Sequence, residues 1–457
     1  MAEASSGTPP EPPAAASSPW LEVRPSGALA GEIAAPASKS VTNRLLAVAA
    51  LAAGTSWLVH PLESDDTDAM AEGLRAFGAG IADVRALRQK SAQGIADGPV
   101  LAIEGTDGRP STPCSTVDAR QSGTTLRFLA PFALLAGGTT TFDGAPSLRR
   151  RPIGGLAEAL AALGAGVRTA GGFPPLAVRS RGLPGGRVRV DAAASSQFAS
   201  ALLLVGPYAA TDLVLEVSHL GAGGYVELTL QVMRRFGAVV DREGDSYTVR
   251  AGSRYAGRRE LVEYDASAAA HLFSLAVATG GEITVTNARE GSLQPDARVV
   301  ELFALMGSEV SRSGSEVSVR GAGRPLPIEA DLSSMPDQLP TLAALAALAD
   351  GTSRFSGLAV SRGHETDRVA AVATELERLG ARVRAGEDWL EVEGGERLRG
   401  GEIETYGDHR MAMAFVALGS RIPGVRIREP GCVAKTYPRF FEDAASLGLV
   451  VRTPGGS

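Results

Sequence analysis

One pattern of polar and apolar positions occurs six times along the chain. Each instance opens with a short polar or helix-capping signature, continues as an apolar run rich in Ala and Leu, turns, usually at a glycine, and ends in a β-branched segment. Because each run is apolar nearly all round, we expect six buried helices, each followed by a strand. The six instances start at Ser38, Gln121, Ser195, Asp265, Pro336 and Asp408.

A second helix is predicted after each of these, and most of the second helices have amphipathic spacing and end in a glycine before another strand. Their starts lie near Asp65, Arg151, Gly224, Leu293, His364 and Lys435. The repeating unit is therefore strand, helix, strand, helix and strands. A chain of 457 residues exceeds what one hydrophobic core usually supports, so two domains of three units each are the simplest partition. The competing interpretation is that six Ala-rich helices merely look alike.

The charge and composition exclude several classes of function. The formal net charge of −6 argues against general binding to nucleic acid or membrane surfaces, and no apolar run reaches the roughly 18 residues of a membrane span. The two cysteines, Cys114 and Cys432, lack the spacing of a zinc site, and a disulfide framework is not expected. Residues 1–19 have no feature of a signal or transit peptide, and we expect a disordered tail. Together these features favour a cytoplasmic protein.

Lysine is rare in this chain, and two of its three lysines lie at predicted helix starts. Lys39 and Lys435 belong to polar signatures, whereas Lys90 lies in an ordinary polar stretch. A helix N-terminus offers free N–H groups and the positive end of the helix dipole, so it attracts phosphate or carboxylate. If these starts meet in one cleft, they form a site for a substrate with two phosphates, or with a phosphate and carboxylates. The cationic residues at the starts are Lys39, Arg127, Arg151, Arg368, Arg410 and Lys435.

The usual cofactor motifs are absent from the sequence. Lys39 is not preceded by the glycine of a phosphate loop, and no dinucleotide-binding glycine motif, nucleophile elbow or HExxH motif occurs. The sequence motifs therefore give no positive evidence for a nucleotide or metal cofactor. The acid–base candidates are Asp337, Glu365, Asp408 and His409. On pattern alone Asp337 could be only a helix cap, Glu365 could belong to a surface ion pair, and His409 could be an interior histidine with satisfied hydrogen bonds.

Eight short strings, in order and at compatible spacings, resemble those of the EPSP synthase (3-phosphoshikimate 1-carboxyvinyltransferase) family from about Leu21 to Leu449. They are PASKSVTNR at 36–44, SGTTLR at 122–127, RPIGGL at 151–156, SSQF at 195–198, PD at 336–337, HETDR at 364–368, YGDHRMAM at 406–413 and AKTYP at 434–438. The resemblance implies the two-domain α/β fold of enolpyruvyltransferases, with three βαβαββ units in each domain and closure like a clamp. It places a continuous domain at 38–263, a discontinuous domain at 20–37 plus 264–457, and the tail at 1–19.

The implied reaction is transfer of the enolpyruvyl group of phosphoenolpyruvate to the 5-hydroxyl of 3-phosphoshikimate, with release of phosphate, in the shikimate pathway of aromatic amino-acid biosynthesis. It proceeds by addition and elimination through a tetrahedral intermediate. A base is needed near the hydroxyl and an acid near the methylene, roles that the family gives to Asp337 and Glu365. The resemblance implies no metal or organic cofactor and small-molecule partners alone, and we expect a monomer.

The resemblance also implies a role for each matched residue. Residues for 3-phosphoshikimate are Lys39, Ser40, Arg44, Ser195, Ser196, Gln197, Asp337 and His364. Residues for phosphoenolpyruvate are Lys39, Gly123, Arg151, Gln197, Arg368, Arg410 and Lys435. Residues for catalysis are Asp337, Glu365, Lys39, His409 and Lys435.

The sequence departs from the family pattern at several positions. The family commonly has Lys at position 364, where a histidine makes the charge depend on pH. The other departures are a Val at 360 for a polar residue, an Ala at 222 for a phosphate-binding Ser, a Gln at 121 for an Asn and a Phe at 128 for a Pro. The changes at Ala222 and Val360 bear on the affinity for the acceptor or on its identity. Because residue 123 is Gly and not a bulkier residue, we predict sensitivity to glyphosate.

Three alternatives remain open. UDP-N-acetylglucosamine enolpyruvyltransferase shares the fold and donor but uses a reactive loop cysteine, and Cys114 lacks the Gly-rich surroundings of that residue. A weakened member could bind such anions for regulation or scaffolding, although retention of Asp337 and Glu365 argues against it. A related enzyme could use another phosphorylated or UDP-linked acceptor.

Overall fold

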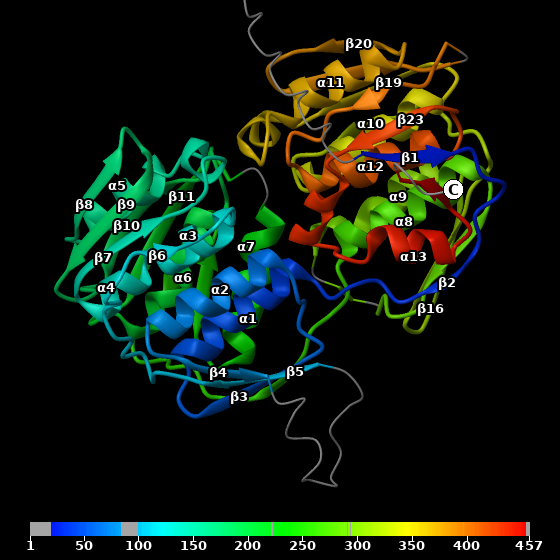
Figure 1. The fold of residues 1–457 in the computed structure, drawn as a ribbon. Coiled ribbons are helices and arrows are strands. Elements are labelled where there is room, and N and C mark those ends of the chain that lie inside the picture. Colours follow the sequence, from blue (N-terminus) through cyan, green and yellow to red (C-terminus); the bar gives the residue numbers. More distant parts are fainter. Residues whose placement is uncertain are drawn as a thin grey trace, which may run out of the picture.

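The computed structural model describes residues 20–83, 99–220, 223–289, 291–292, 294–395 and 397–453. Their strands form six sheets of four strands each, and the helices pack beside them in the two bodies visible in Figure 1. The predicted tail at 1–19, Lys90, Ala222 and Leu293 lie outside the described residues. None of the helices in the described part of the chain is both long and apolar enough to cross a membrane.

The six apolar runs form the buried helices that the pattern predicts. They are α1 (Lys39–Leu51), α3 (Gly123–Leu129) with α4 (Phe132–Ala136), α6 (Gln197–Val205), α8 (Ala266–Thr279), α10 (Leu339–Leu348) and α12 (His409–Gly419). Every residue of α8 and α12 is buried, which agrees with their lack of a polar face. The second run is divided at Pro131, which lies between α3 and α4, since proline lacks the N–H that a continuous helix needs.

The six second helices are present, and several begin later than the pattern predicts. They are α2 (Asp65–Ala76), α5 (Gly154–Ala162), α7 (Gly223–Arg235), α9 (Val299–Leu305), α11 (Arg368–Arg378) and α13 (Phe440–Ser446). Arg151 is extended and is followed by Pro152, so α5 starts three residues after the predicted position. Lys435 ends a 3-10 turn (η7, Pro430–Lys435), and α13 starts after Pro438.

The six sheets share one pairing scheme. In each, an edge strand pairs in parallel with the strand after the buried helix, which is followed by two antiparallel neighbours. Three sheets in this order are β14 (Arg259–Leu261), β3 (Thr55–Val59), β5 (Val100–Glu104), β4 (Gly80–Asp83); β6 (Val117–Asp118), β7 (Gly138–Asp143), β9 (Phe173–Ser180), β8 (Gly166–Ala170); and β10 (Gly186–Asp191), β11 (Leu213–Ser218), β13 (Ser246–Val249), β12 (Val240–Glu243). The other three are β2 (Gly31–Ile33), β15 (Glu282–Val285), β17 (Glu316–Arg320), β16 (Glu309–Ser313); β18 (Glu329–Asp331), β19 (Thr352–Ser356), β21 (Trp389–Glu393), β20 (Arg382–Ala385); and β22 (Glu402–Ile403), β23 (Val425–Arg428), β1 (Trp20–Arg24), β24 (Val450–Arg452). The prediction of an α/β fold with six repeated units is confirmed.

The side chains form two separate large hydrophobic cores. One contains residues between Val41 and Val262, and the other contains residues from 21–35 together with residues from 264–449. We refer to 38–263 as the continuous half and to 20–37 with 264–453 as the split half. The first two strands of the chain, β1 and β2, lie among the strands of the split half (Figure 1).

The chain passes between the two halves at two segments that lie side by side. Ser38 N donates to the carbonyl of Glu263 at 2.8 Å, and Asp265 N donates to the carbonyl of Pro36 at 2.7 Å. Ala37 forms an antiparallel bridge with Tyr264. Both connections therefore lie at one place, next to the starts of α1 and α8.

Candidate active site

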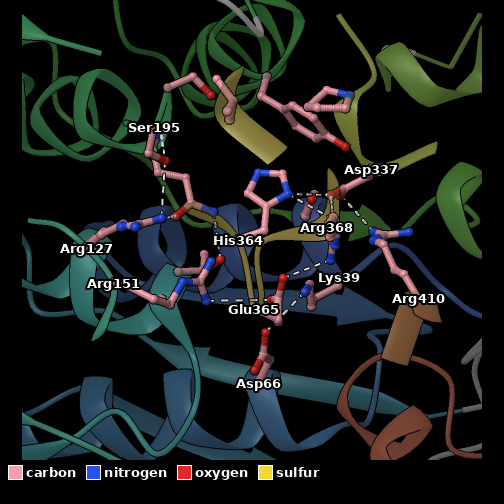
Figure 2. A pocket seen from close by; sticks show the side chains of 18 of the residues that line it. Lys39, Asp66, Arg127, Arg151, Ser195, Asp337, His364, Glu365, Arg368 and Arg410 are labelled. Carbon is pink, nitrogen blue, oxygen red and sulfur yellow. Dashed lines mark hydrogen bonds and ion pairs between the residues drawn. The ribbon is translucent and has the colours of Figure 1, made fainter. Parts of the chain in front are cut away.

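A single pocket collects residues from both halves, and most of them lie at helix starts. Lys39, Gly123, Gln197, Arg368 and His409 are the first residues of five helices. The pocket is lined by Lys39, Ser40, Arg44, Asp66, Gly123, Thr124, Arg127, Arg151, Ser195, Ser196, Gln197, Tyr225, Pro336, Asp337, Val360, His364, Glu365, Arg368, His409 and Arg410. The structure therefore brings together every residue that the resemblance assigns to the site except Lys435, whose Nζ lies 2.9 Å from Glu365 Oε1 without lining the pocket. Figure 2 shows Arg368 between Asp337 and Glu365.

Glu365 is held by cations from both halves. Its Oε1 lies 2.9 Å from Lys435 Nζ and 3.6 Å from Arg151 Nη1, and its Oε2 accepts from Arg368 Nη2 at 2.8 Å. Burial alone would raise the pKa of the carboxyl, but Lys435, Arg151 and Arg368 hold it well below its usual value. Glu365 is thus ionised, and the surface ion pair considered from the sequence is a buried cluster.

Asp337 lies on the other side of the same arginine. It accepts hydrogen bonds from Arg368 Nη1 at 2.6 Å and from Arg410 Nη2 at 2.8 Å, and His364 Nδ1 lies 3.6 Å away. Burial would raise its pKa, whereas Arg410 and Arg368 lower it strongly. Its side chain faces the pocket between these cations and does not accept a hydrogen bond as the N-cap of α10.

Arg368 is fixed from behind by Asp408. Arg368 Nε donates to Asp408 Oδ2 at 2.7 Å, and both side chains are almost completely buried. The other oxygen of Asp408 accepts from Arg410 N at 2.9 Å and so caps α12. Asp408, an acid–base candidate from the sequence, is therefore an anchor for two arginines of the site.

The two histidines of the pocket are neutral. Burial, followed by the charge of Arg368, lowers the pKa of His364 to about 3, and Arg368 Nη1 lies 2.9 Å from His364 Nδ1. Since that arginine can only donate, Nδ1 accepts and Nε2 carries the proton. Burial and the charges of Arg410 and Lys39 lower the pKa of His409 well below its usual value. Neither ring nitrogen of His409 has a hydrogen-bond partner among the described residues.

Arg127 organises the Ser-Ser-Gln segment at the start of α6. Its Nη1 donates to Gln197 Oε1 at 2.9 Å and to Ser195 Oγ at 3.2 Å. Gln197 Nε2 donates in turn to Thr124 Oγ1 at 3.0 Å. Burial, followed by the charge of Arg151, lowers the pKa of Arg127 to about 9. Hydroxyl, amide and guanidinium groups are thus preassembled where a phosphate could bind.

Lys39 and Arg44 occupy the side of the pocket formed by α1. Lys39 Nζ pairs with the buried Asp66 at 3.1 Å. Arg44 Nε donates to Thr229 Oγ1 at 2.8 Å, and Arg44 Nη2 donates to the carbonyl of Tyr225 at 3.1 Å. Asp66, Thr124 and Tyr225 were not predicted as pocket residues. Asp66 stands in an acidic helix start that gives a weak signal, and Thr124 belongs to the matched string at 122–127, whereas no local pattern sets Tyr225 apart.

Gly123 leaves room for an arginine of the site. A Cβ built there would lie 2.8 Å from Arg151 Cζ and Nη1. Two of the positions that depart from the family pattern, His364 and Val360, line the pocket. A third, Phe128, has a buried ring, and Arg44 Cζ lies 5.3 Å from the centre of that ring.

Two further predicted features concern the surroundings of the pocket. Gln121 offers its carbonyl to Lys435 Nζ at 3.5 Å, across the two halves. Cys114 is exposed and is not among the described residues that line the pocket. The described part of the chain contains no group of three or more His, Cys, Asp and Glu side chains placed to hold a metal ion.

Comparison with solved structures identifies the class to which this fold belongs. EPSP synthase from Acinetobacter baumannii superposes with a TM-score of 0.75 at 26% identity, over 95% of this chain and 99% of that chain. The enolpyruvyl transferase NikO from Streptomyces tendae has the same fold, with a TM-score of 0.74 at 19% identity, over 96% and 99% of the two chains. The chain therefore has the enolpyruvyltransferase fold.

Sequence comparison identifies the family within that class. The sequence profile of EPSP synthase (3-phosphoshikimate 1-carboxyvinyltransferase) matches residues 23–444. A 3-phosphoshikimate 1-carboxyvinyltransferase from Laribacter hongkongensis is 39% identical over 436 residues, covering 94% of this chain and 99% of the relative. A second, from Methanoculleus marisnigri, is 38% identical over 435 residues, covering 94% and 100%. The chain belongs to the EPSP synthase family.

Proposed function

We propose that this chain transfers the enolpyruvyl group of phosphoenolpyruvate to the 5-hydroxyl of 3-phosphoshikimate and releases phosphate. The observation that carries the proposal is the pair of carboxylates, Asp337 and Glu365, held 2.6 Å and 2.8 Å from the same buried Arg368 in a pocket with many cations. Such a site supplies a general base, a general acid and the positive charges that bind two anionic substrates. Membership of the EPSP synthase family supports the assignment.

The two substrates would divide the pocket between them. The acceptor would use Lys39, Ser40, Arg44, Ser195, Ser196, Gln197, Asp337 and His364. The donor would use Lys39, Gly123, Arg151, Gln197, Arg368, Arg410 and Lys435. The Ser195–Gln197 segment suits the 3-phosphate because Arg127 already orients its hydroxyl and amide groups. Val360 lines the pocket as an apolar side chain.

Binding of phosphoenolpyruvate would first rearrange the ion pairs around Glu365 and Asp337. Phosphoenolpyruvate carries a phosphate and a carboxylate, so Lys435, Arg151 and Arg368 turn from Glu365 to the donor. The pKa of the buried Glu365 carboxyl then rises, and the group can carry a proton. In the same way, Arg410 leaves Asp337 for the donor, which makes Asp337 a better base.

In the addition step, Asp337 takes the proton of the 5-hydroxyl while the oxygen attacks the vinyl carbon. The methylene carbon takes a proton from Glu365 and becomes a methyl group. In the elimination step, the ionised Glu365 removes a methyl proton, the double bond reforms, and phosphate leaves with the bonding electron pair. The neutral His409 lines the same pocket, within electrostatic reach of Lys39 and Glu365. Its two ring nitrogens, which have no partner in the described part of the chain, can relay a proton to or from a bound substrate.

We also propose that the two halves are domains that close over the substrates. The two hydrophobic cores support this division, and so does the location of both chain connections at one place. Arg151 and Glu365 already meet across the cleft. One chain supplies the whole site, so a monomer is sufficient for activity.

Transfer to a UDP-linked acceptor is the second candidate, and it is less favoured. The exposed Cys114 lies away from the pocket, and the preassembled serines and glutamine suit a sugar phosphate.

The test is phosphate release from the purified chain with phosphoenolpyruvate, with and without 3-phosphoshikimate. We expect release only with both substrates, loss of at least about 100-fold in Glu365→Gln, and near-normal activity in Glu377→Gln. Glu377 is exposed on α11, the helix that begins three residues after Glu365, and provides the matched control. Release with UDP-N-acetylglucosamine but not with 3-phosphoshikimate would replace the assignment with the second candidate.

A further inference from the structure

A buried carboxylate joins the two halves beside the pocket and belongs to none of the matched strings. Asp296 Oδ2 accepts from the hydroxyl of Tyr225 at 2.5 Å, and Asp296 Oδ1 accepts from Gln338 Nε2 at 2.6 Å. Tyr225 is in the continuous half, while Asp296 and Gln338 are in the split half. Asp296 itself is completely buried.

Both partners of Asp296 are tied to residues proposed for the acceptor. Tyr225 lines the pocket, and its carbonyl accepts from Arg44 Nη2 at 3.1 Å. Gln338 directly follows the proposed base, Asp337, in the 3-10 turn η5 (Pro336–Gln338). Asp296 therefore lies between a pocket wall from one half and the segment that carries the base from the other.

The backbones around this contact are fitted closely. A Cβ built on Gly224 would lie 2.9 Å from Pro295 Cβ, so the residues before Tyr225 and Asp296 also meet across the halves. Burial, followed by the charge of Asp296, raises the pKa of Tyr225 well above its usual value, so the hydroxyl stays protonated and donates. Burial and the charge of Asp337 raise the pKa of Asp296 itself. Water can satisfy the hydrogen bonds of an exposed carboxylate. Because Asp296 is buried, its carboxylate depends instead on the Tyr225 hydroxyl and the Gln338 amide.

We propose that Asp296 is a positioning residue for the acceptor: it holds the Tyr225 hydroxyl and the Gln338 amide from opposite halves, and so shapes the acceptor side of the pocket. The inference rests on the proposed function. With its proton committed to Asp296, the phenolic oxygen of Tyr225 offers only lone pairs to the pocket. It therefore suits a hydroxyl of the acceptor and disfavours an anionic group there.

The test separates the Michaelis constants of the two substrates in Asp296→Ala, Tyr225→Phe and the double variant. Tyr225→Phe removes only the hydroxyl and keeps the fold-determining volume of the ring. We expect the KM for 3-phosphoshikimate to rise about tenfold in each single variant, as for the loss of a hydrogen bond to a charged group. The KM for phosphoenolpyruvate should change less than about twofold. The double variant should be no worse than Asp296→Ala, because the two side chains act as one unit.

Tyr255→Phe is the matched control. Its hydroxyl is also buried and donates to the carbonyl of Leu204, but it does not line the pocket. We expect it to leave both KM values unchanged. Equal rises in both KM values, or additive effects in the double variant, would overturn the positioning role. If Asp296→Ala does not fold, an unchanged acceptor KM in Tyr225→Phe would still overturn it. A wild-type chain without turnover would overturn the proposed function itself, which makes the two failures distinguishable.

Discussion

The space beside residue 123 is filled by the guanidinium of Arg151, so even a methyl group there disturbs the proposed donor site. In Gly123→Ala the new Cβ would lie 2.8 Å from Arg151 Cζ, and the arginine must move. We expect the KM for phosphoenolpyruvate to rise about tenfold, as for a weakened charge-assisted contact, with little change in the KM for 3-phosphoshikimate. Inhibition by glyphosate should weaken in parallel.

Steady-state kinetics with each substrate varied in turn provides the measurement. Gly27→Ala is the matched control, because a Cβ at Gly27 meets nothing within 4 Å. An unchanged donor KM in Gly123→Ala would show that Arg151 relaxes without cost or does not bind the donor.

The ion cluster at Glu365 also makes stability depend on pH. The pKa of Glu365 in the folded chain lies well below 4.5, so its contribution is complete above the unfolded value of about 4.3 and is lost as pH falls through the folded value. Glu365→Gln should therefore lower the free energy of unfolding by about 1–3 kcal/mol at pH 7. The difference from wild type should shrink steadily below about pH 4.5. Urea unfolding of both proteins between pH 7 and pH 3 measures it, and a difference that does not depend on pH would contradict the assignment.

The sequence located most of the pocket residues because they belong to helix starts with distinctive polar strings. It could not locate Tyr225 or Asp296, because neither belongs to a distinctive local string and their contact joins the two halves. Nor could it show that His364 is neutral: that follows from its burial beside Arg368, which only the packed structure contains. Long-range contacts of this kind leave no local pattern.

At the scale of helices and strands, one carboxylate binds the starts of α1, which lines the pocket, and of α8, which does not. Asp265 Oδ1 accepts from Ala268 N at 2.9 Å and caps α8, while Oδ2 accepts from Lys39 N at 2.9 Å at the start of α1. Asp265→Ala should lower the free energy of unfolding by about 1–3 kcal/mol. Asp265→Asn can keep the cap but not the second bond, because its amide nitrogen donates.

Asp265→Ala should therefore be less stable than Asp265→Asn, whereas the two variants should have similar activity. We expect Asp265→Asn to lose less than about 1 kcal/mol. Both should raise the KM for each substrate, since Lys39 and Ser40 shift with the start of α1. Chemical denaturation and steady-state kinetics give the two readouts, and wild-type KM values in Asp265→Asn would contradict this role for the shared carboxylate.

The apolar periodicity predicted every one of these helices but not all of their starts. Periodicity reports which residues are buried, and partly buried positions continue through the extended Arg151–Pro152 entry to α5 and the 3-10 turn before α13. The division of the second run at Pro131 follows from proline chemistry rather than from the apolar pattern.

At the scale of the whole molecule, the repeat predicted six similar units but not which strand completes each one. Strand β14 returns to pair with β3, and β1 pairs with β23, more than 400 residues away. Such pairings depend on chain topology, which a repeated local pattern does not contain. For the same reason the split of one half between the two chain ends came only from family resemblance.

Two separate cores predict that the halves unfold separately when no ligand joins them. The direct links are the connections near Ala37 and Tyr264 and a few contacts across the cleft, such as Arg151–Glu365. Without ligand, we expect pulsed hydrogen exchange across a urea series to give different midpoints for the amides of β3 and β5 and for those of β19 and β21. With 3-phosphoshikimate and glyphosate at about 100 times their Kd, each ligand adds about 2.7 kcal/mol to the state in which both halves are folded. The two midpoints should then coincide at higher urea. A single midpoint without ligand would mean that the contacts across the cleft already couple the halves, and the domains would be units of packing but not of stability.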